Sequence, residues 1–201
     1  MSSSILPNSV WGGPVRVHDQ RTNRWNTDVS TADTVRNLCR LARTYATDPA
    51  VMAATRGAIS ALATGSSQRD ICSAIFHWVR STVRFVEDEQ LLYEELGVQP
   101  ADLDQELLIV PPVLLAMPQP MGDCDDFSLL ISSMCLSAGV QPFYVTVAAD
   151  ASDPFKFSHI YVCAKLADEG TYFPLDAGNR LNAVPPGWES DAVTRKAVWK
   201  I

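Results

Sequence analysis

The chain has 201 residues, a length that suits one domain with short arms and leaves little room for two independent cores. Its 47% hydrophobic and 19% charged residues exclude a disordered or a fibrous protein. The longest apolar run, 107–117, is far shorter than the roughly 20 residues of a membrane helix. The first ten residues lack the positive charge of a secretory signal. We therefore expect no membrane span and synthesis in a cytoplasm.

The net charge of −7 is distributed unevenly along the chain. Between Phe85 and Phe155 there are thirteen Asp and Glu residues and no Lys, Arg or His, so this stretch carries −13 and the remainder +6. Because such a surface repels phosphate backbones, the composition argues against nucleic acid as a partner. The acidic stretch predicts a solvated face, with a docking site for a cationic partner as the alternative.

The five cysteines form neither a regular disulfide framework nor a CxxC pair. Because the count is odd, at least one thiol is expected to be free. Four of them fall on predicted helix or strand faces and are interpreted as small buried hydrophobic residues: Cys39, Cys72, Cys135 and Cys163.

Polar, turn-rich residues 1–28 predict an N-terminal arm, after which helical signals begin. Ser30 and Asp33 resemble a capping box, and the apolar spacing that follows predicts a helix over 31–47. Asp48 and Pro49 open a second helix that we expect to end at Gly65.

A third helix is indicated by Ile71, Ile75 and Trp78 on one face, followed by a short extended piece at 83–86. The acidic, proline-punctuated residues 87–122 predict an insert of short helical turns. A connection of this length is often a lid or a docking element.

A further helix is predicted to begin after Asp123 as its cap and to stop at Gly139, with apolar residues at helical spacing between them. Strands are expected at 142–149, 156–166 and 171–176, the last two joined by a hairpin turn around 167–170. Helices followed by a meandering antiparallel sheet predict an α+β domain over 29–177, with 178–201 as a C-terminal tail.

Cys124 lies in the first turn of the helix that Asp123 is expected to cap. Unpaired backbone N–H groups and the helix dipole stabilise a thiolate there, and the Cys124 N–H could serve as one oxyanion donor. Neighbouring aspartates oppose this effect, but Asp125 and Asp126 should point away because successive helical side chains diverge by about 100°. Cys124 is therefore the candidate nucleophile.

The chain has only three candidates for an imidazole partner. His18 lies in the polar arm and is expected to be solvated, while His77 lies off the apolar face of the third helix and should be exposed or capping. His159 sits within a predicted strand, where a buried ring needs hydrogen-bond partners. A satisfied core histidine is the alternative to catalysis at this position.

Asp176 ends the next strand, and strand register tests whether it can meet His159. A four-residue loop of 166–169 places the two directly opposite each other. A loop of 167–170 instead sets Tyr161 opposite Asp176 and leaves His159 one diagonal away on the same face. In either register the carboxylate could orient the ring, whereas an odd loop would separate the two. The alternative for Asp176 is a turn former at a strand end.

Three segments together resemble the transglutaminase-like superfamily, a papain-like group: GDCDDFSLL at 122–130, FSHIYV at 157–162 and FPLDA at 173–177. The helix around IFHWVR at 75–80 is also similar to one that precedes the core in bacterial members. The resemblance implies a papain/transglutaminase-like fold, in which the nucleophile helix packs on a small antiparallel sheet. It also implies that Cys124 is the nucleophile, His159 the base and Asp176 the orienting acid.

The closer similarity is to small members encoded among phage and prophage structural genes. It rests on residues 122–128, on the strand at 157–161, and on PGWE at 186–189 with the final Arg195, Lys196 and Trp199. It implies thiol acyl chemistry on a protein or peptide substrate, by cleavage or by transfer to an amine, without metal or organic cofactor. The setting would be a bacterial cytoplasm during synthesis and then a virion tail or its morphogenesis. Partners could be other virion proteins, held by the arm and the tail. Gln119 precedes Cys124 as in some papain-like enzymes, but no second oxyanion donor is assigned.

Two other interpretations remain. The fold could be retained in a non-catalytic structural protein of the virion. Exposed tryptophans and basic residues at both ends would then contact neighbouring virion proteins. Alternatively, Asp123, Asp125 and Asp126, with His159, could form a metal site. This second alternative is disfavoured because adjacent helical side chains diverge and a thiolate beside hard carboxylates suits no common ion well.

Overall fold

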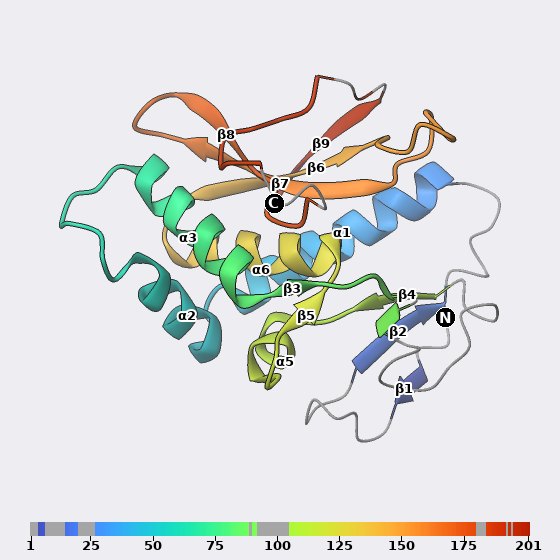
Figure 1. Cartoon of the computed structure of the whole chain (residues 1–201), viewed down its shortest axis with the longest axis horizontal. Coiled ribbons are helices and arrows are strands. Elements are labelled where there is room, and N and C mark those ends of the chain that lie inside the picture. The colour runs from blue at the N-terminus through green and yellow to red at the C-terminus, as the bar shows by residue number, and fades with distance from the viewer. Residues whose placement is uncertain are drawn as a thin grey trace.

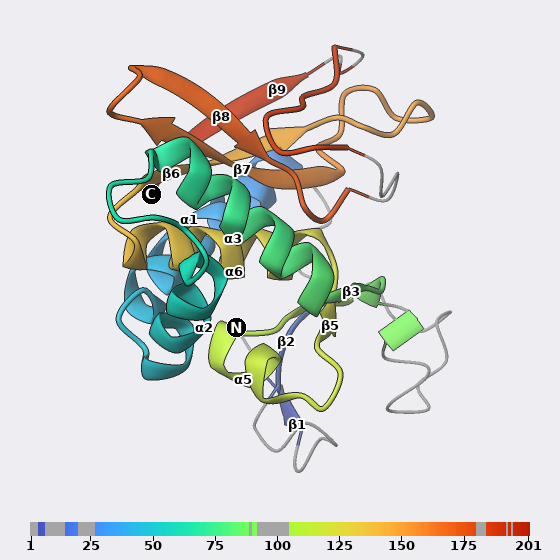
Figure 2. The ribbon, with the colours of Figure 1, turned by 60° about the vertical axis from the view of Figure 1, so that its left-hand side comes forward.

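A computed structural model describes residues 4–6, 15–19, 27–88, 90–91, 105–179, 184–191, 193 and 195–201. Side chains are described from Thr31 onward, apart from those of 105–107. In both Figure 1 and Figure 2 an antiparallel sheet forms one layer, and the main helices lie together on one side of it.

The main sheet has four antiparallel strands in the order β8-β7-β6-β9. These are β6 (Gln141–Val147), β7 (His159–Leu166), β8 (Thr171–Leu175) and β9 (Lys196–Lys200). The first three match the predicted strands, so the α+β prediction is confirmed. β9 was not predicted: it lies within the segment interpreted as a tail, yet it pairs with β6 along its whole length.

The predicted N-terminal helices are present as α1 (Thr27–Tyr45), α2 (Pro49–Ile59) and α3 (Gln68–Thr82). The helix expected to run to Gly65 ends earlier, because the backbone N–H and the hydroxyl of Ser60 both bond the carbonyl of Gly57. Gly65 instead occupies a left-handed turn with φ 85°. A capping box of Ser67 and Asp70 starts α3.

The central element is α6 (Cys124–Ser137), which contacts α1, α2, α3, β6 and β7. The sequence predicts one apolar face, but every residue from Asp125 to Cys135 is buried. Its serines are accommodated by hydrogen bonding. Ser133 bonds the carbonyl of Leu129 at 2.7 Å, and Ser132 lies 2.6 Å from the Tyr144 hydroxyl. A helix enclosed on all sides fixes the position of its first residue.

Smaller strands lie beyond α6, next to the short helix α5 (Pro111–Ala116). β3 (Arg84–Phe85) pairs in parallel with β5 (Met121–Gly122), which joins the end of α3 to the start of α6. β1 (Ser4–Leu6), β2 (Val15–Asp19) and β4 (Gln105–Leu108) form a three-stranded antiparallel sheet. The predicted arm therefore pairs with the acidic insert. Trp11 and Trp25 lie outside the described residues.

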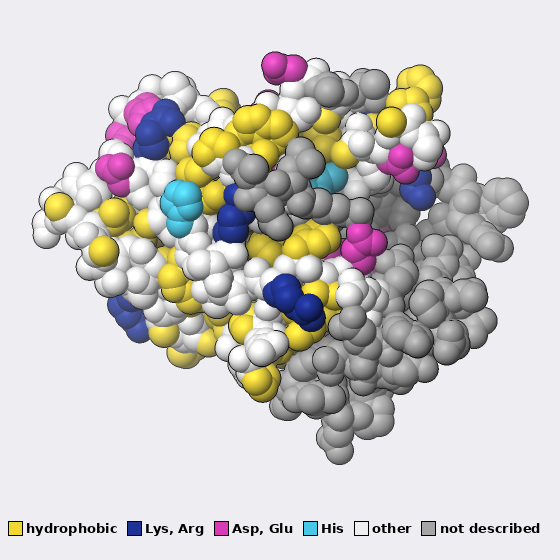
Figure 3. Space-filling view, viewed as in Figure 1, with side chains coloured by type: hydrophobic (Ala, Val, Ile, Leu, Met, Phe, Trp, Pro, Cys, Tyr) yellow, Lys and Arg dark blue, Asp and Glu magenta, His cyan; other side chains and the backbone are white. Residues whose placement is uncertain are grey.

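The acidic stretch does not form one solvated face in the part that is described. Of its thirteen acidic residues, seven have described side chains; Asp88, Asp125 and Asp126 are buried, and only Asp150 and Asp153 are exposed. Acidic side chains are scattered over the surface in Figure 3. The interpretation as a solubilising surface is therefore wrong for the buried carboxylates, which need a structural explanation. None of the described helices is long and apolar enough to span a bilayer.

Candidate active site

Cys124 is the first residue of α6, and a reciprocal capping box holds it there. The Asp123 carboxylate accepts from the N–H of Asp125 at 3.2 Å, and the Asp126 carboxylate accepts from the N–H of Asp123 at 3.3 Å. The prediction that Asp123 caps the helix is confirmed. The backbone at Cys124 is thus fixed by hydrogen bonds on both sides of it.

Asp126 is fully buried and ties three segments together. Its second oxygen accepts from the N–H of Ile109 at 2.7 Å, which links the insert to α6. Burial, with the nearby charges of Asp123 and Asp88, raises the pKa of Asp126 well above its ordinary value. Gly122 leaves room for this carboxylate, since a Cβ there would lie 2.3 Å from Asp126 Oδ2.

The raised pKa of Asp126 gives a pH-dependent stability. The folded state holds the proton more tightly than the unfolded chain, so this group stabilises the fold fully below its ordinary pKa of 3.8. The contribution is lost as the pH rises through the elevated value. We expect Asp126→Asn to abolish this downward slope of stability with pH. Urea unfolding of both proteins from pH 4 to 8 measures it; parallel curves would contradict the assignment.

The β7–β8 hairpin decides whether His159 and Asp176 meet. Val162 pairs with Leu175 and Leu166 with Thr171, which leaves a four-residue loop at 167–170. Continued one step, this register sets Tyr161 opposite Asp176 and His159 one diagonal away. Nε2 of His159 lies 2.9 Å from Oδ1 of Asp176. The structure therefore adopts the second of the two predicted registers and brings ring and carboxylate into hydrogen-bonding contact.

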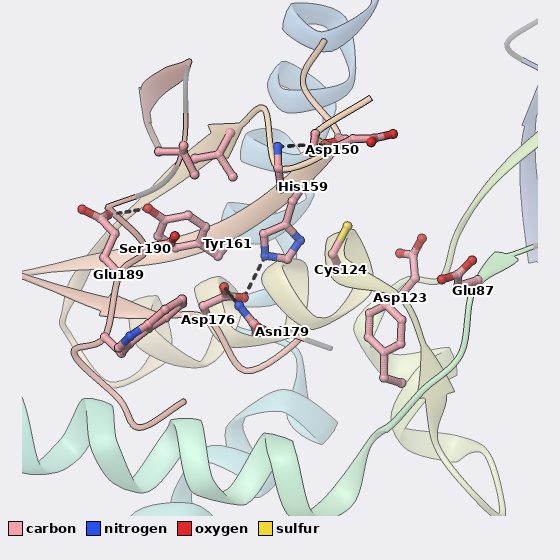
Figure 4. A pocket seen from close by; sticks show the side chains of 17 residues that line it. Glu87, Asp123, Cys124, Asp150, His159, Tyr161, Asp176, Asn179, Glu189 and Ser190 are labelled. Atoms are coloured by element: carbon pink, nitrogen blue, oxygen red, sulfur yellow. Dashed lines mark hydrogen bonds and ion pairs between the residues drawn. The ribbon is translucent and has the colours of Figure 1, made fainter. Parts of the chain in front are cut away.

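His159 and Cys124 also face each other. In Figure 4 the imidazole lies between the Asp176 carboxylate and the Cys124 thiol. Because Nε2 is hydrogen-bonded to Asp176, Nδ1 is the ring nitrogen that remains available for a hydrogen bond to the sulfur. The hydroxyl of Ser128 on α6 donates to the carbonyl of Ile160 at 3.2 Å, which ties α6 to β7 next to His159.

The three residues line a cavity of about 790 Å³. The cavity is also lined by residues of the segment after β8, including Trp188 and Glu189 of the PGWE motif. Tyr161 lies roughly parallel to the His159 ring, at 6.0 Å between centroids and 25° between planes. Its hydroxyl donates to Glu189, which also pairs with Lys196 of β9 at 2.6 Å. Burial and the Glu189 charge raise the pKa of Tyr161, which favours its neutral, hydrogen-bond-donating form.

A partly buried arginine, Arg80, lies near Asp176. The Arg80 guanidinium packs 4.8 Å from the centre of the Phe76 ring and donates to the carbonyl of Val184. Burial lowers the pKa of Arg80, and the negative charge of Asp176 opposes this decrease. Arg80 therefore places a positive charge close enough to Asp176 for the two side chains to interact electrostatically.

Most of the other residues singled out from the sequence lie away from the cavity lining. His77 is exposed and Gln119 is exposed outside the cavity lining, so neither takes part in the site. Cys72, Cys135 and Cys163 are buried as expected, and Cys39 partly so. The side chain of His18 lies outside the described part. The tryptophans near the chain ends were expected to be exposed. Trp199 is instead partly buried, and its Nε1 donates a hydrogen bond to the Thr146 hydroxyl at 3.0 Å.

The carboxylates that come together differ from the predicted metal set. Oxygens of Asp88, Asp123 and Asp126 lie within 4.8 Å of one another, and this group includes neither Asp125 nor His159. Sequence analysis missed Asp88, which is brought here by the chain that follows β3. Asn179 was also missed as a site residue. Its side chain bonds Asp176, and the only signal was a polar side chain three residues after it.

Solved structures of other proteins are similar to this chain, and they include the following two. No protein-family profile matches the chain, nor does any curated protein sequence. The crystal structure of a TGase is 14% identical in sequence and has a TM-score of 0.45. The match covers 72% of this chain and 35% of the TGase chain. A candidate cysteine protease from Cytophaga hutchinsonii is 16% identical and has a TM-score of 0.42. The match covers 94% of this chain and 59% of the other protein's chain. The chain thus spans less than two thirds of the length of either protein that it resembles.

Proposed function

We propose that this protein is a thiol acyl enzyme of the transglutaminase-like type, with Cys124 as nucleophile, His159 as base and Asp176 as orienting acid. The observation that carries this proposal is the position of the His159 ring, bonded to Asp176 through Nε2 and facing Cys124 on its other side. A structural histidine in a strand needs a hydrogen-bond partner, but it does not need a thiol at a helix N-terminus opposite that partner.

In the first half of the reaction, His159 takes the thiol proton and the thiolate attacks a carboxamide or peptide carbonyl carbon. The C=O electron pair moves to oxygen, where the N–H of Cys124 supplies a hydrogen bond. The intermediate collapses by expelling the amine, which takes its proton from the imidazolium of His159. A thioester on Cys124 remains.

In the second half, water or a second amine attacks the thioester carbon while His159 accepts its proton. The Cys124 sulfur then leaves and recovers a proton from the imidazolium. Water gives hydrolysis and an amine gives transfer, so the same three residues serve both outcomes. Asp176 keeps a proton on Nε2 throughout, so that Nδ1 is the atom that exchanges protons with the sulfur.

Alkylation with iodoacetamide across pH, read by mass spectrometry of each cysteine peptide, tests the proposal. We expect selective labelling of Cys124 that stays fast below pH 7, where an ordinary thiol with a pKa of about 8.5 is only a few per cent ionised. The buried Cys72 and Cys135 are internal controls, because neither should react in the folded protein. Labelling that follows an ordinary thiol, or that is unchanged in His159→Ala, would overturn it.

A second measurement separates a competent site from an idle one. With p-nitrophenyl acetate we expect a burst of p-nitrophenol equal to the protein concentration, followed by turnover that added glycine ethyl ester accelerates. Cys124→Ala should abolish the burst, and His159→Ala should slow it. A reactive thiol without turnover would instead favour the alternative, a non-catalytic virion protein that retains the fold.

The biological setting is part of the proposal and rests on the resemblance alone. Trp188 and Glu189, two residues of the PGWE segment that contributes to the phage similarity, line the cavity. We propose a phage or prophage virion, at the tail or during morphogenesis, with a peptide or isopeptide bond of the cell wall or of a virion protein as substrate. Release of amine groups from purified peptidoglycan tests whether the substrate is a bond of the cell wall. Cleavage or crosslinking of co-expressed virion proteins tests whether it is a bond of a virion protein.

A further inference from the structure

We propose that Asn179 is a positioning residue for the acyl chemistry: its side-chain amide fixes the Asp176 carboxylate in the orientation that serves His159. The inference rests on the proposed function for its chemical meaning, and on the geometry around Asp176 for its evidence. Asn179 also lines the cavity, where Figure 4 shows it beside Asp176.

The two oxygens of Asp176 have different hydrogen-bond partners. Oδ1 lies 2.9 Å from Nε2 of His159, and Oδ2 accepts from Nδ2 of Asn179 at 2.8 Å. A carboxylate held at one oxygen can still rotate about its Cβ–Cγ bond. Held at both oxygens, it presents Oδ1 to the ring in a single orientation. The Asn179 amide therefore removes the rotation that would break the contact with His159.

Burial makes this second hydrogen bond consequential. The side chain of Asp176 is 7% exposed and that of His159 is 17% exposed, so water has little access to replace a missing partner. A carboxylate can only accept, so Asn179 must present its NH₂ group to Oδ2. An aspartate at position 179 would have the same shape but would set two carboxylates against each other, which favours a shared proton and a neutral Asp176.

The turn that carries Asn179 is held directly against the nucleophile helix. A Cβ added to Gly178 would lie 3.3 Å from the Cα of Cys124 and 3.3 Å from the Cβ of Phe127. Ala177, in the same turn, is buried. The backbone from Asp176 to Asn179 therefore has little freedom to shift relative to Cys124. This rigid base lets a side chain three residues from Asp176 control its orientation.

A double-mutant cycle on the rate of Cys124 alkylation at pH 6 tests the inference. We expect Asn179→Ala to slow the reaction roughly tenfold, as for the loss of one hydrogen bond to a charged group, and Asn179→Asp to slow it at least as much. In an Asp176→Ala background the same changes should have no further effect, because Asn179 acts through Asp176. Asn37→Ala, an exposed asparagine of α1, is the matched control and should match wild type.

The state of the His159 ring gives a readout that a merely structural residue would not move. We expect ¹⁵N spectra, recorded at a pH where the His159 ring is neutral, to show the proton on Nε2 in wild type and a mixture of tautomers in Asn179→Asp, with an unchanged thermal midpoint. A wild-type rate and tautomer in Asn179→Ala, or an equal loss in the Asp176→Ala background, would overturn the inference. If wild-type Cys124 reacts as an ordinary thiol, the proposed function fails, and the tautomer alone still decides the role of Asn179.

Discussion

We expect Asp176→Asn to slow alkylation of Cys124 at pH 6 by on the order of 100-fold, because in the proposed mechanism the Asp176 charge stabilises the imidazolium that forms when His159 takes the thiol proton. Both oxygens of Asp176 accept hydrogen bonds, from His159 and from Asn179. An amide at 176 offers one acceptor and one donor group. To keep both contacts, either the Asn179 amide must turn over and present its oxygen, or His159 must move its proton to Nδ1 and lose the ability to accept one from the sulfur.

The measurement is the second-order rate of labelling of Cys124 between pH 5 and 9. Near pH 9 the variant should approach wild type, since an ordinary thiol is by then mostly ionised. Asp150→Asn is the matched control, because Asp150 lines the same cavity but is exposed and bonds Ser152 rather than His159. An equal slowing in Asp150→Asn would mean that the general negative charge of the cavity matters, and not the contact between Asp176 and His159.

Gly122→Ala is expected to destabilise the fold by about 3 kcal/mol, the upper part of the range for overpacking a buried site. The new methyl group would lie 2.3 Å from Oδ2 and 2.8 Å from Cβ of Asp126. Asp126 cannot yield easily, because it accepts from the N–H groups of both Ile109 and Asp123. Relieving the clash therefore breaks either the cap of α6 or its link to the insert.

Urea unfolding at pH 7 measures this loss, with Gly57→Ala as the control. A Cβ at Gly57 meets nothing within 4 Å, and the residue lies inside α2, so the same substitution should stabilise the protein by about 0.5–1 kcal/mol. Opposite signs for one chemical change would isolate the packing against Asp126. If Gly122→Ala unfolds at the wild-type urea concentration, the turn before α6 has more room than its geometry indicates.

The arrangement of the site was predictable where it follows from periodicity. Side chains alternate along a strand, so an even hairpin loop places His159 and Asp176 on the same face whichever of the two loops forms. The start of α6 was predictable for a similar reason, since a capping residue three positions before another acid marks the first turn. These local rules were enough to bring His159 and Asp176 together.

What could not be predicted depends on contacts between distant segments. The β9 segment is short and basic. Nothing in its sequence indicates that it pairs with the edge strand β6. The acidic stretch looked solvated because composition carries no information on burial. Only the folded chain places Asp126 beside the N–H groups that compensate it. The contact of Asn179 with Asp176 depends on how the turn at 177–178 lies against α6.

The pairing of β9 with β6 has a consequence for the order in which the chain assembles. Helix α6 and the strands β6, β7 and β8 come from one continuous segment, 124–175, whereas the pairing of β9 with β6 joins residues as distant as Phe143 and Lys200. Contacts between near neighbours form sooner than those that close long loops, so the three-stranded unit should assemble first. Until β9 arrives, β6 presents an unprotected edge, and this is the stage at which chains are most prone to aggregate.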